Sequence, residues 1–196
     1  MLSTAIFPCL FTDGARVLGE LTYALEAQVY TDRMLLQKIA DSYEGNIQKL
    51  ESQMFGCSCK QGPSCNKRAA LLPSVKYELN QLIAAPENWI YYGFFTLLLE
   101  SAERFIQKIL IFADLDCRIE RARLQEGLNE KKARKAIREH DQKATWWSQF
   151  LFNSSPYNPD LYDTFIRYEC QDLVDVVAYV YMVHEEHAQP DYQGCT

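Results

Sequence analysis

The chain has 196 residues, of which 48% are hydrophobic and 23% are charged, and its formal net charge is −6. This length and balance predict one globular domain spanning residues 1–196, and they exclude disordered, collagen-like and fibrous coiled-coil chains. The net acidity argues against general binding of nucleic acid or anionic membranes, and no apolar run is long enough to span a bilayer.

Short apolar runs and helical periodicity alternate along the first half of the chain. Residues 4–11 (TAIFPCLF) read as a buried strand weakened by Pro8, and apolar residues recur at helical spacing over 17–25. A brief strand is expected at 28–30. Thr31 or Asp32 can then cap a helix whose apolar face is Leu35, Leu36 and Ile39.

The second half continues the same alternation. A helix over about 71–84 leads to a strand at 89–92 that Gly93 ends, and a uniformly apolar strand is expected at 109–113. Residues 114–152 are helical and strongly charged, 161–166 predict a fifth strand, and a last helix carries an apolar stripe from Leu173 to Tyr181.

This alternation predicts an α/β fold: a parallel sheet of about five strands with helices on both faces, in three layers. Ligands of such sheets lie at the carboxyl ends of strands, beside helix N-termini. Residues 11–16, which follow the first strand, are therefore the first place to expect chemistry.

Positive charge is concentrated between Arg118 and Lys143, where nine of the 20 basic residues lie and the local net charge is +4. Arg118 and Arg121 are neighbours on one helical face and directly follow a buried strand, so we expect them to grip an anion. For Lys131 to Arg138 we instead favour a solvated face laced with local ion pairs, such as Glu139 with Lys135 or Lys143.

The opening stretch FTDGARVLGELTYALEAQVYTDRMLLQKIAD resembles the first strand, loop and helix of the cytidylate-kinase-like family of P-loop nucleoside monophosphate kinases. The matching residues here are Phe11, Gly14, Arg16, Gly19, Tyr30, Asp32 and Arg33. The resemblance resumes at WIYYG (89–93), ILIFADLDCRIER (109–121), LNEKKARKAIREHDQKATWW (128–147) and NPDLYDTFI (158–166).

The resemblance implies a P-loop NTPase-like fold with a helical lid at 114–152, and ATP-dependent phosphoryl transfer to CMP, dCMP or a similar acceptor. Catalysis in such kinases rests on positioning and on neutralising the transferring group with backbone amides, Mg²⁺ and arginines. In an active enzyme, Arg16, Arg118, Arg121 and Lys143 would clamp phosphates, with Asp141 beside them in the lid.

The phosphate loop departs from the family pattern, because Thr12, Asp13, Gly14 and Ala15 stand where Gly-Ser-Gly-Gly is expected. A β-branched Thr12 suits a left-handed backbone poorly. A carboxylate about 4 Å from a phosphate charge costs on the order of 4 kcal/mol at an effective dielectric constant of 20. Elsewhere, Phe94 and Ala144 replace expected basic residues, and Arg167 replaces an expected Asn.

We therefore expect the Asp13 carboxylate to cap the helix that begins near Gly14 and to take the place of a phosphate. This hypothesis predicts a catalytically degenerate kinase that acts as a binding or regulatory module, with little or no ATP binding. Two alternatives stay open. Asp13 could hold Mg²⁺, or the chain could be an active kinase that uses ATP and Mg²⁺.

Residues 56–70 predict an irregular, cysteine-rich loop that the resemblance does not explain. Cys57, Cys59 and Cys65 could hold Zn²⁺ with a fourth ligand from Cys195 or a histidine, which would make the chain a thiol- or metal-dependent sensor. Their spacing matches no usual zinc motif, so reduced loop thiols are the favoured interpretation. The odd count of seven cysteines and the absence of a secretory signal predict a cytoplasmic protein.

Two further groups of residues are candidate sites. His184 and His187 could share a metal, although a histidine at the core boundary is the favoured interpretation for His184. The aromatic cluster near the end of the lid cannot all face inward on one helix, so part of it could form a self- or partner-association surface. Its members are Trp146, Trp147, Phe150 and Phe152, with Leu151 among them.

Overall fold

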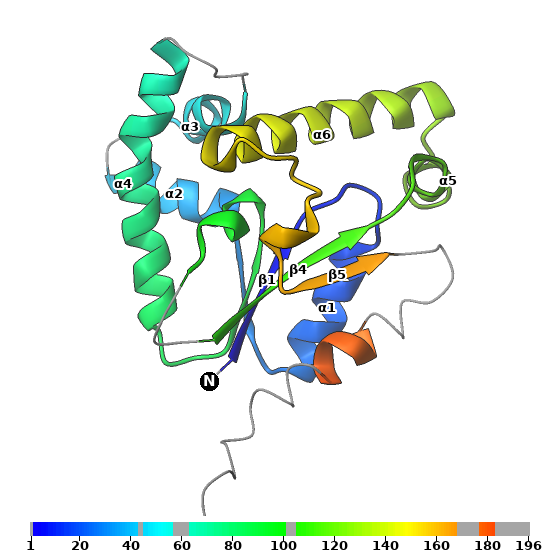
Figure 1. The fold of residues 1–196 in the computed structure, drawn as a ribbon, viewed down its shortest axis with the longest axis horizontal. Coiled ribbons are helices and arrows are strands. Elements are labelled where there is room, and N and C mark those ends of the chain that lie inside the picture. Colours follow the sequence, from blue (N-terminus) through cyan, green and yellow to red (C-terminus); the bar gives the residue numbers. More distant parts are fainter. Residues whose placement is uncertain (1, 43–44, 57–62, 101–104, 168–176, 183–196) are drawn as a thin grey trace, which may run out of the picture.

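A computed structural model describes residues 2–42, 45–56, 63–100, 105–167 and 177–182. Its centre is a sheet of five strands in the order β2-β3-β1-β4-β5, and every neighbouring pair is parallel (Figure 1). The strands are β1 (Leu2–Phe7), β2 (Gln28–Thr31), β3 (Trp89–Tyr92), β4 (Phe105–Phe112) and β5 (Thr164–Arg167). The predicted five-stranded parallel α/β fold is confirmed.

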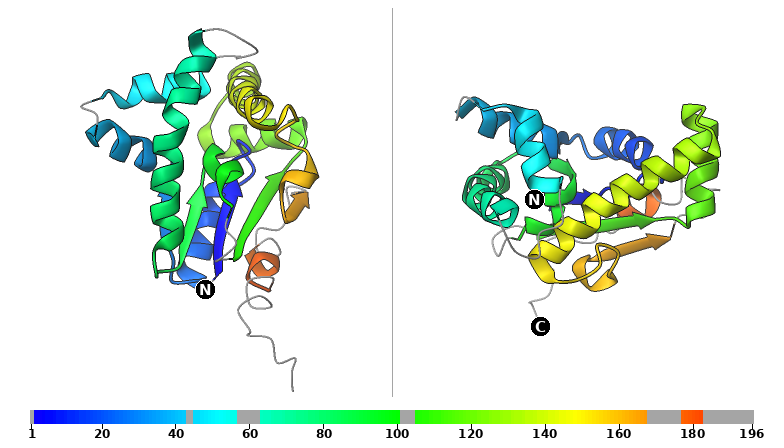
Figure 2. Two further views of the ribbon diagram at one scale, coloured as in Figure 1. Left: turned by 60° about the vertical axis from the view of Figure 1, so that its left-hand side comes forward. Right: turned by 90° about the horizontal axis from the view of Figure 1, so that it is seen from above.

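Helices cover both faces of this sheet and its carboxyl edge (Figure 2). They are α1 (Gly14–Ala24), α2 (Asp32–Ser42), α3 (Ile47–Phe55), α4 (Pro63–Ala84), α5 (Leu115–Glu126) and α6 (Glu130–Phe152). Two short 3₁₀ turns, η1 (Phe94–Leu98) and η2 (Pro159–Leu161), follow β3 and precede β5. Helices α5 and α6 occupy the segment 114–152 that was expected to be helical, and α6 lies across the end at which the strands finish (Figure 1).

The core is divided between the two faces because successive strand side chains point to opposite sides. Ala5 and Phe7 pack with Tyr91 and Leu110 under α2, α3 and α4. Ile6 packs on the other face among residues of α1 and the helical residues 177–182. A third, smaller cluster joins α5 to α6 and includes Phe11 from the loop after β1. The site at the carboxyl edge therefore rests on rigid layers.

Several predicted boundaries move. The strand expected at 4–11 ends at Phe7, because Pro8 has no amide hydrogen for the sheet and the chain then turns. Strand β4 begins at Phe105, earlier than expected, whereas β5 begins only at Thr164 because η2 takes the preceding residues. Helix α3 was not predicted, although Ile47, Leu50 and Met54 share one face.

The cysteine-rich segment is also corrected. Helix α4 begins at Pro63, whose fixed φ suits a first helical turn, so the predicted irregular loop at 56–70 is wrong from residue 63 onward. Cys65 is a free thiol on that helix, whereas Cys57, Cys59, Cys195, His184 and His187 lie outside the described residues. Among the residues that are described, no group of three metal-ligating side chains gathers.

The fold also bears on the predicted reduced thiols and on the predicted absence of a membrane-spanning segment. Cys117 is disulfide-bonded, so the prediction of reduced thiols is wrong for this residue; pairing depends on proximity in space, which spacing along the chain does not reveal. In the described part of the chain, no helix combines the length and the apolar character that crossing a membrane would require.

Candidate functional site

The loop between β1 and α1 has a left-handed backbone at two positions, and neither of them is glycine. Phe11 and Asp13 have φ angles of 62° and 55°. Thr12 lies between these two residues, and its hydroxyl donates a 2.7 Å hydrogen bond to the Cys9 carbonyl oxygen. The left-handed backbone expected at Thr12 is thus found at Phe11 and Asp13 instead. A non-glycine residue keeps this conformation only where the surrounding structure holds it in place.

Asp13 occupies this loop as an internal anion. Its side chain is fully buried, with a carboxylate oxygen 2.7 Å from Arg121 Nη1 and 3.8 Å from Arg16 Nη1. The Gln125 side-chain amide donates to the other carboxylate oxygen. Arg121 and Gln125 both belong to α5, so this one carboxylate joins the loop to the lid-like segment.

The predicted capping role of Asp13 is wrong in its geometry. Asp13 is the N-cap residue of α1, but its side chain makes no capping hydrogen bond. The carboxylate turns instead to Arg121, because charge-assisted bonds from a guanidinium are stronger than a bond from a neutral amide. The anion that Arg121 contacts thus belongs to this chain, and the expectation that Arg118 and Arg121 bind the anion of a ligand stays a prediction.

Arg118 grips a second internal anion. Its guanidinium is buried and forms a two-pronged contact with Asp141 on α6, at 2.9 and 2.7 Å, while its Nε donates to the Leu10 carbonyl oxygen at 2.8 Å. The Tyr157 hydroxyl donates to the same carboxylate at 2.7 Å. Two of the residues expected in the catalytic lid thus hold the loop, α5 and α6 together.

Electrostatics keep this second pair charged. Burial opposes ionisation of Asp141, but hydrogen bonds from His140, Arg118 and Tyr157 hold its pKa well below the usual range. Cys9, which lies nearby in the loop, has its pKa raised to about 11 by burial, against the opposing effect of Arg118. Its thiol is therefore protonated at neutral pH and is a poor nucleophile.

An open cleft of about 420 Å³ lies beside the loop between β1 and α1, where β1, β2 and β3 end beneath α6. Two cations line it, Arg33 from α2 and Lys143 from α6, and neither has an ion-pair partner within 4 Å among the described residues. The acidic side chains of the lining are Asp32, Glu51 and Glu139. Lys143 therefore lines this cleft, whereas Arg118 and Arg121 do not.

Asp32 forms the back of this cleft, and sequence reasoning treated it only as a helix cap and a resemblance residue. It accepts hydrogen bonds from the amides of Phe94 and Phe95, at 2.6 and 3.1 Å, and from the Tyr91 hydroxyl at 2.8 Å. Burial raises the pKa of Asp32 to about 6, although these three bonds lower it. Gly93, directly after β3, is the sequence feature that could have indicated this contact, because a side chain there would collide with the Asp32 carboxylate.

The aromatic cluster on α6 is mostly packed inward. Trp147 is fully buried, and its indole nitrogen donates a 2.7 Å hydrogen bond to the Phe94 carbonyl oxygen. The ring of Phe150 stacks on that of Trp147. The Arg68 guanidinium lies over the Phe150 ring, 5.0 Å from its centre. Only Phe152 of the four expected association residues is largely exposed, at 42%.

The charged face of α6 is solvated and carries local ion pairs, as expected from the sequence. Glu139 pairs with Lys135 at 3.7 Å, one of the two partners predicted for it, and Arg134 pairs with Glu130 at 2.8 Å. These groups are exposed, and exposed helix pairs contribute only about 0.3–0.5 kcal/mol each. The run from Lys131 to Arg138 is therefore a solvated face.

Comparison with known proteins places this geometry in context. The model of the cytidylate kinase-like family matches residues 20–169, a segment that begins after the loop between β1 and α1. No curated protein matches the chain. Among solved structures, an uncharacterized protein from Eubacterium ventriosum superposes with a TM-score of 0.69 at 16% identity, covering 94% of this chain and 99% of its own.

Two shikimate kinases have a similar fold. The enzyme from Acinetobacter baumannii, solved in complex with shikimate, gives a TM-score of 0.54 at 9% identity over 96% of this chain and 95% of its own. The enzyme from Bacteroides thetaiotaomicron gives 0.52 at 10% identity over 96% and 99%. At these identities the likeness concerns the arrangement of strands and helices.

Proposed function

Because the chain belongs to the cytidylate kinase-like family, we propose that it is a member in which an aspartate has replaced the donor phosphate, leaving a binding or regulatory module rather than a phosphotransferase. The observation that carries this proposal is the buried Asp13 carboxylate on Arg121, Arg16 and Gln125. A phosphate group entering the loop would have to displace that carboxylate from both guanidinium groups.

The residues of the loop do not fit ATP with Mg²⁺. Backbone amides and cations must face a phosphate, whereas here a carboxylate faces the same space and its charge is already balanced by arginine. The carboxylate is equally unsuited to Mg²⁺, because a guanidinium and an amide occupy its oxygens. The loop also lacks the Lys and Ser/Thr of a phosphate-binding G-x-x-x-x-G-K-[ST] motif.

The open cleft supplies the binding surface of the proposed module. Arg33 and Lys143 are its cations, and Asp32 forms its back wall. A small molecule that carries both an anionic group and hydrogen-bond donors fits this arrangement. Arg33 and Lys143 can bind the anionic group, and the carboxylates of Asp32, Glu51 and Glu139 on the same lining can accept from the donors. The closed loop and the open cleft together favour ligand binding without phosphoryl transfer.

The decisive experiment is isothermal titration with ATP·Mg of the wild-type protein and an Asp13→Gly variant. We expect no measurable heat from the wild-type protein. The variant should bind, because Arg121 and Arg16 lose their internal anion and the loop gains a glycine at its left-handed position. Adding Arg121→Ala to Asp13→Gly should abolish that gain.

Asp116→Ala is the matched control. It removes the same charge from a side chain that is almost fully exposed and lies 3.8 Å from Arg134, so it should leave ATP binding undetectable. Micromolar binding of ATP·Mg by the wild-type protein would overturn the proposal, as would a variant Asp13→Gly that folds but still shows no binding.

An active kinase is the second candidate, and the open cleft is the observation that favours it. A working enzyme needs an acceptor site bordered by cations, which Arg33 and Lys143 could provide. Transfer of labelled phosphate from ATP to CMP by the wild-type protein, lost in Arg121→Ala, would establish this candidate. Under the proposal favoured here, no label is transferred.

A further inference from the structure

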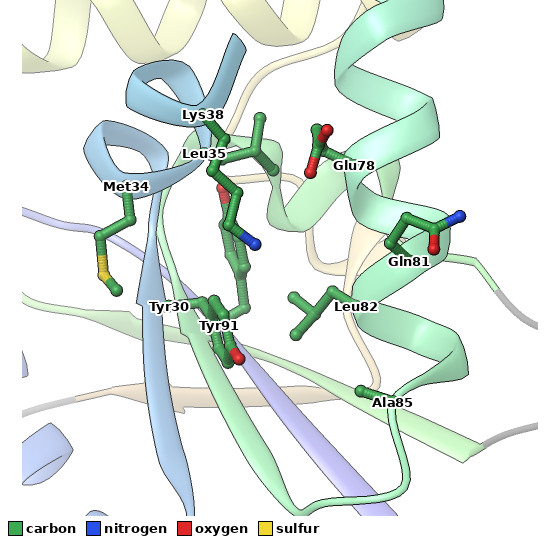
Figure 3. A pocket seen from close by; sticks show the side chains of 9 residues that line it. All are labelled: Tyr30, Met34, Leu35, Lys38, Glu78, Gln81, Leu82, Ala85 and Tyr91. Atoms are coloured by element: carbon green, nitrogen blue, oxygen red, sulfur yellow. The ribbon is translucent and has the colours of Figure 1, made fainter. Parts of the chain in front are cut away.

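A second pocket lies between α2 and α4, against β2 and β3 (Figure 3). It has a volume of about 200 Å³ and opens between helices α2 and α4. Its lining includes none of the residues of the closed loop or of the lid. It is therefore separate from the site described above.

The inner side of this pocket is lined by apolar side chains. Leu35 and Leu82 are buried and face each other from α2 and α4, and the ring of Tyr91 forms the wall between them. The ring of Tyr30 stands at the entrance. Such a surface favours a planar aromatic body, because aromatic rings prefer stacked or edge contacts with one another.

Two opposite charges converge over this apolar surface. Lys38 extends from α2 and Glu78 from α4, and Figure 3 shows both side chains directed into the space between the helices. Lys38 Nζ lies 5.8 Å from the centre of the Tyr30 ring. Within the described part of the chain, Lys38 and Glu78 form no ion pair with each other, so each can still serve a ligand.

The hydroxyl of Tyr91 is not available to a ligand in the same way. It donates to Asp32 at 2.8 Å, and Asp32 belongs to the cleft. Tyr91 therefore offers this pocket its ring only. The polar contacts of a bound molecule would come from the rim, where Lys38 donates and Glu78 accepts.

We propose that this pocket binds small, neutral aromatic carboxamides. The ring would lie against Tyr30 and Leu82, over the buried ring of Tyr91; the carbonyl oxygen would accept from Lys38, and the amide nitrogen would donate to Glu78. A neutral molecule with both groups suits the pair, because an aromatic carboxylate meets repulsion from Glu78 and an aromatic amine meets repulsion from Lys38. The volume limits the ligand to one ring.

The test uses three probes of the same size: benzamide, benzoate and benzylamine. Their binding to the wild-type protein can be followed by ligand-observed NMR and ranked by titration, with affinities on the order of millimolar for such small molecules. We expect benzamide to bind more tightly than either charged probe. Equal binding of all three, or no binding of benzamide, would overturn the proposal.

Two substitutions should change the ranking rather than merely weaken binding. In Glu78→Gln, benzoate should gain about tenfold relative to benzamide, because Lys38 is left without an opposing charge. In Lys38→Met, benzylamine should gain similarly. Glu20→Gln on α1 and Lys76→Met on the exposed side of α4 make the same charge changes away from the pocket, and they should preserve the wild-type order.

The variants also distinguish this site from the cleft. Both substituted residues are exposed or half-buried, so folding should be retained, and the melting temperature provides the check. An unchanged ranking in both folded variants would contradict the assigned roles of Lys38 and Glu78. The inference does not depend on the proposed function, because none of its probes enters the phosphate loop.

Discussion

Two aspartates at the same end of the sheet are stabilised by different chemistry. Asp13 is compensated by the charge of Arg121, whereas Asp32 is held by two backbone amides and a tyrosine hydroxyl. A buried carboxylate with a cationic partner stays ionised, but one that has only neutral donors gains less against the cost of burial. Asp32 is consequently the group that we expect to titrate near physiological pH.

The first prediction concerns the pH dependence of stability. Burial raises the pKa of Asp32 to about 6, above its ordinary value near 3.9 in an unfolded chain. Between about pH 4 and pH 6 the native state therefore binds more protons than the unfolded state, so its stability falls as pH rises through this window. The contribution lost should be about 2–3 kcal/mol.

Chemical unfolding of the wild-type protein and Asp32→Asn at pH 4, 5, 6 and 7 measures this contribution. The difference between the two proteins isolates Asp32, because the other carboxyl groups titrate alike in both. The free energy of unfolding of the wild-type protein should fall relative to that of the variant as pH rises. A constant difference would mean that folding does not raise the pKa of Asp32.

The second prediction concerns the glycine beside Asp32. A Cβ at Gly93 would collide with the Asp32 carboxylate, which must then leave the amides of Phe94 and Phe95. Gly93→Ala should lower the free energy of unfolding by about 2–3 kcal/mol. Gly19→Ala is its control, because nothing lies within 4 Å and a helix-interior alanine should add about 0.5–1 kcal/mol. Urea denaturation distinguishes the opposite signs.

At the scale of elements, the strands and most helices could be predicted from the sequence because their signals are local. The strand at 89–92 is found where its apolar residues and Gly93 place it, and α2 follows from Asp32 and its apolar face. The partners of Asp13 could not be predicted, since Gln125 lies 112 residues away and its approach depends on how α5 packs. Asp13 was identified as the closing residue, but its supposed capping bond rested on local geometry alone.

The third prediction tests how α5 and α6 are joined. Arg118→Met should lower the free energy of unfolding by about 3 kcal/mol, because it leaves Asp141 without its guanidinium and the Leu10 carbonyl without its donor. Arg123→Met, on the same helix, removes only an exposed pair with Glu120 and should change stability by less than about 0.5 kcal/mol. Comparable losses in both variants would show that the α5 charge matters more than the buried contact.

At the scale of the whole molecule, the cleft and the pocket between α2 and α4 share a wall. Tyr91 presents its ring to the pocket and its hydroxyl to Asp32, and Asp32 in turn holds the turn that begins at Phe94. Tyr30 and Leu35 line the pocket, while Thr31, Asp32 and Arg33 between them line the cleft. A molecule that moves the Tyr91 ring therefore acts on the position of the carboxylate behind the cleft.

The last prediction follows from this shared wall. Benzamide bound in the pocket between α2 and α4 should shift the backbone amide signals of Phe94 and Phe95 in ¹⁵N-resolved NMR spectra. Both amides donate to the Asp32 carboxylate, which also accepts from Tyr91. In Tyr91→Phe the ring remains but the hydroxyl is lost, so benzamide should still bind while these shifts become smaller. Linkage requires the effect to be reciprocal, and protonation of Asp32 should change benzamide affinity in the wild-type protein more than in Tyr91→Phe. Equal shifts in both proteins would place the coupling elsewhere in the sheet.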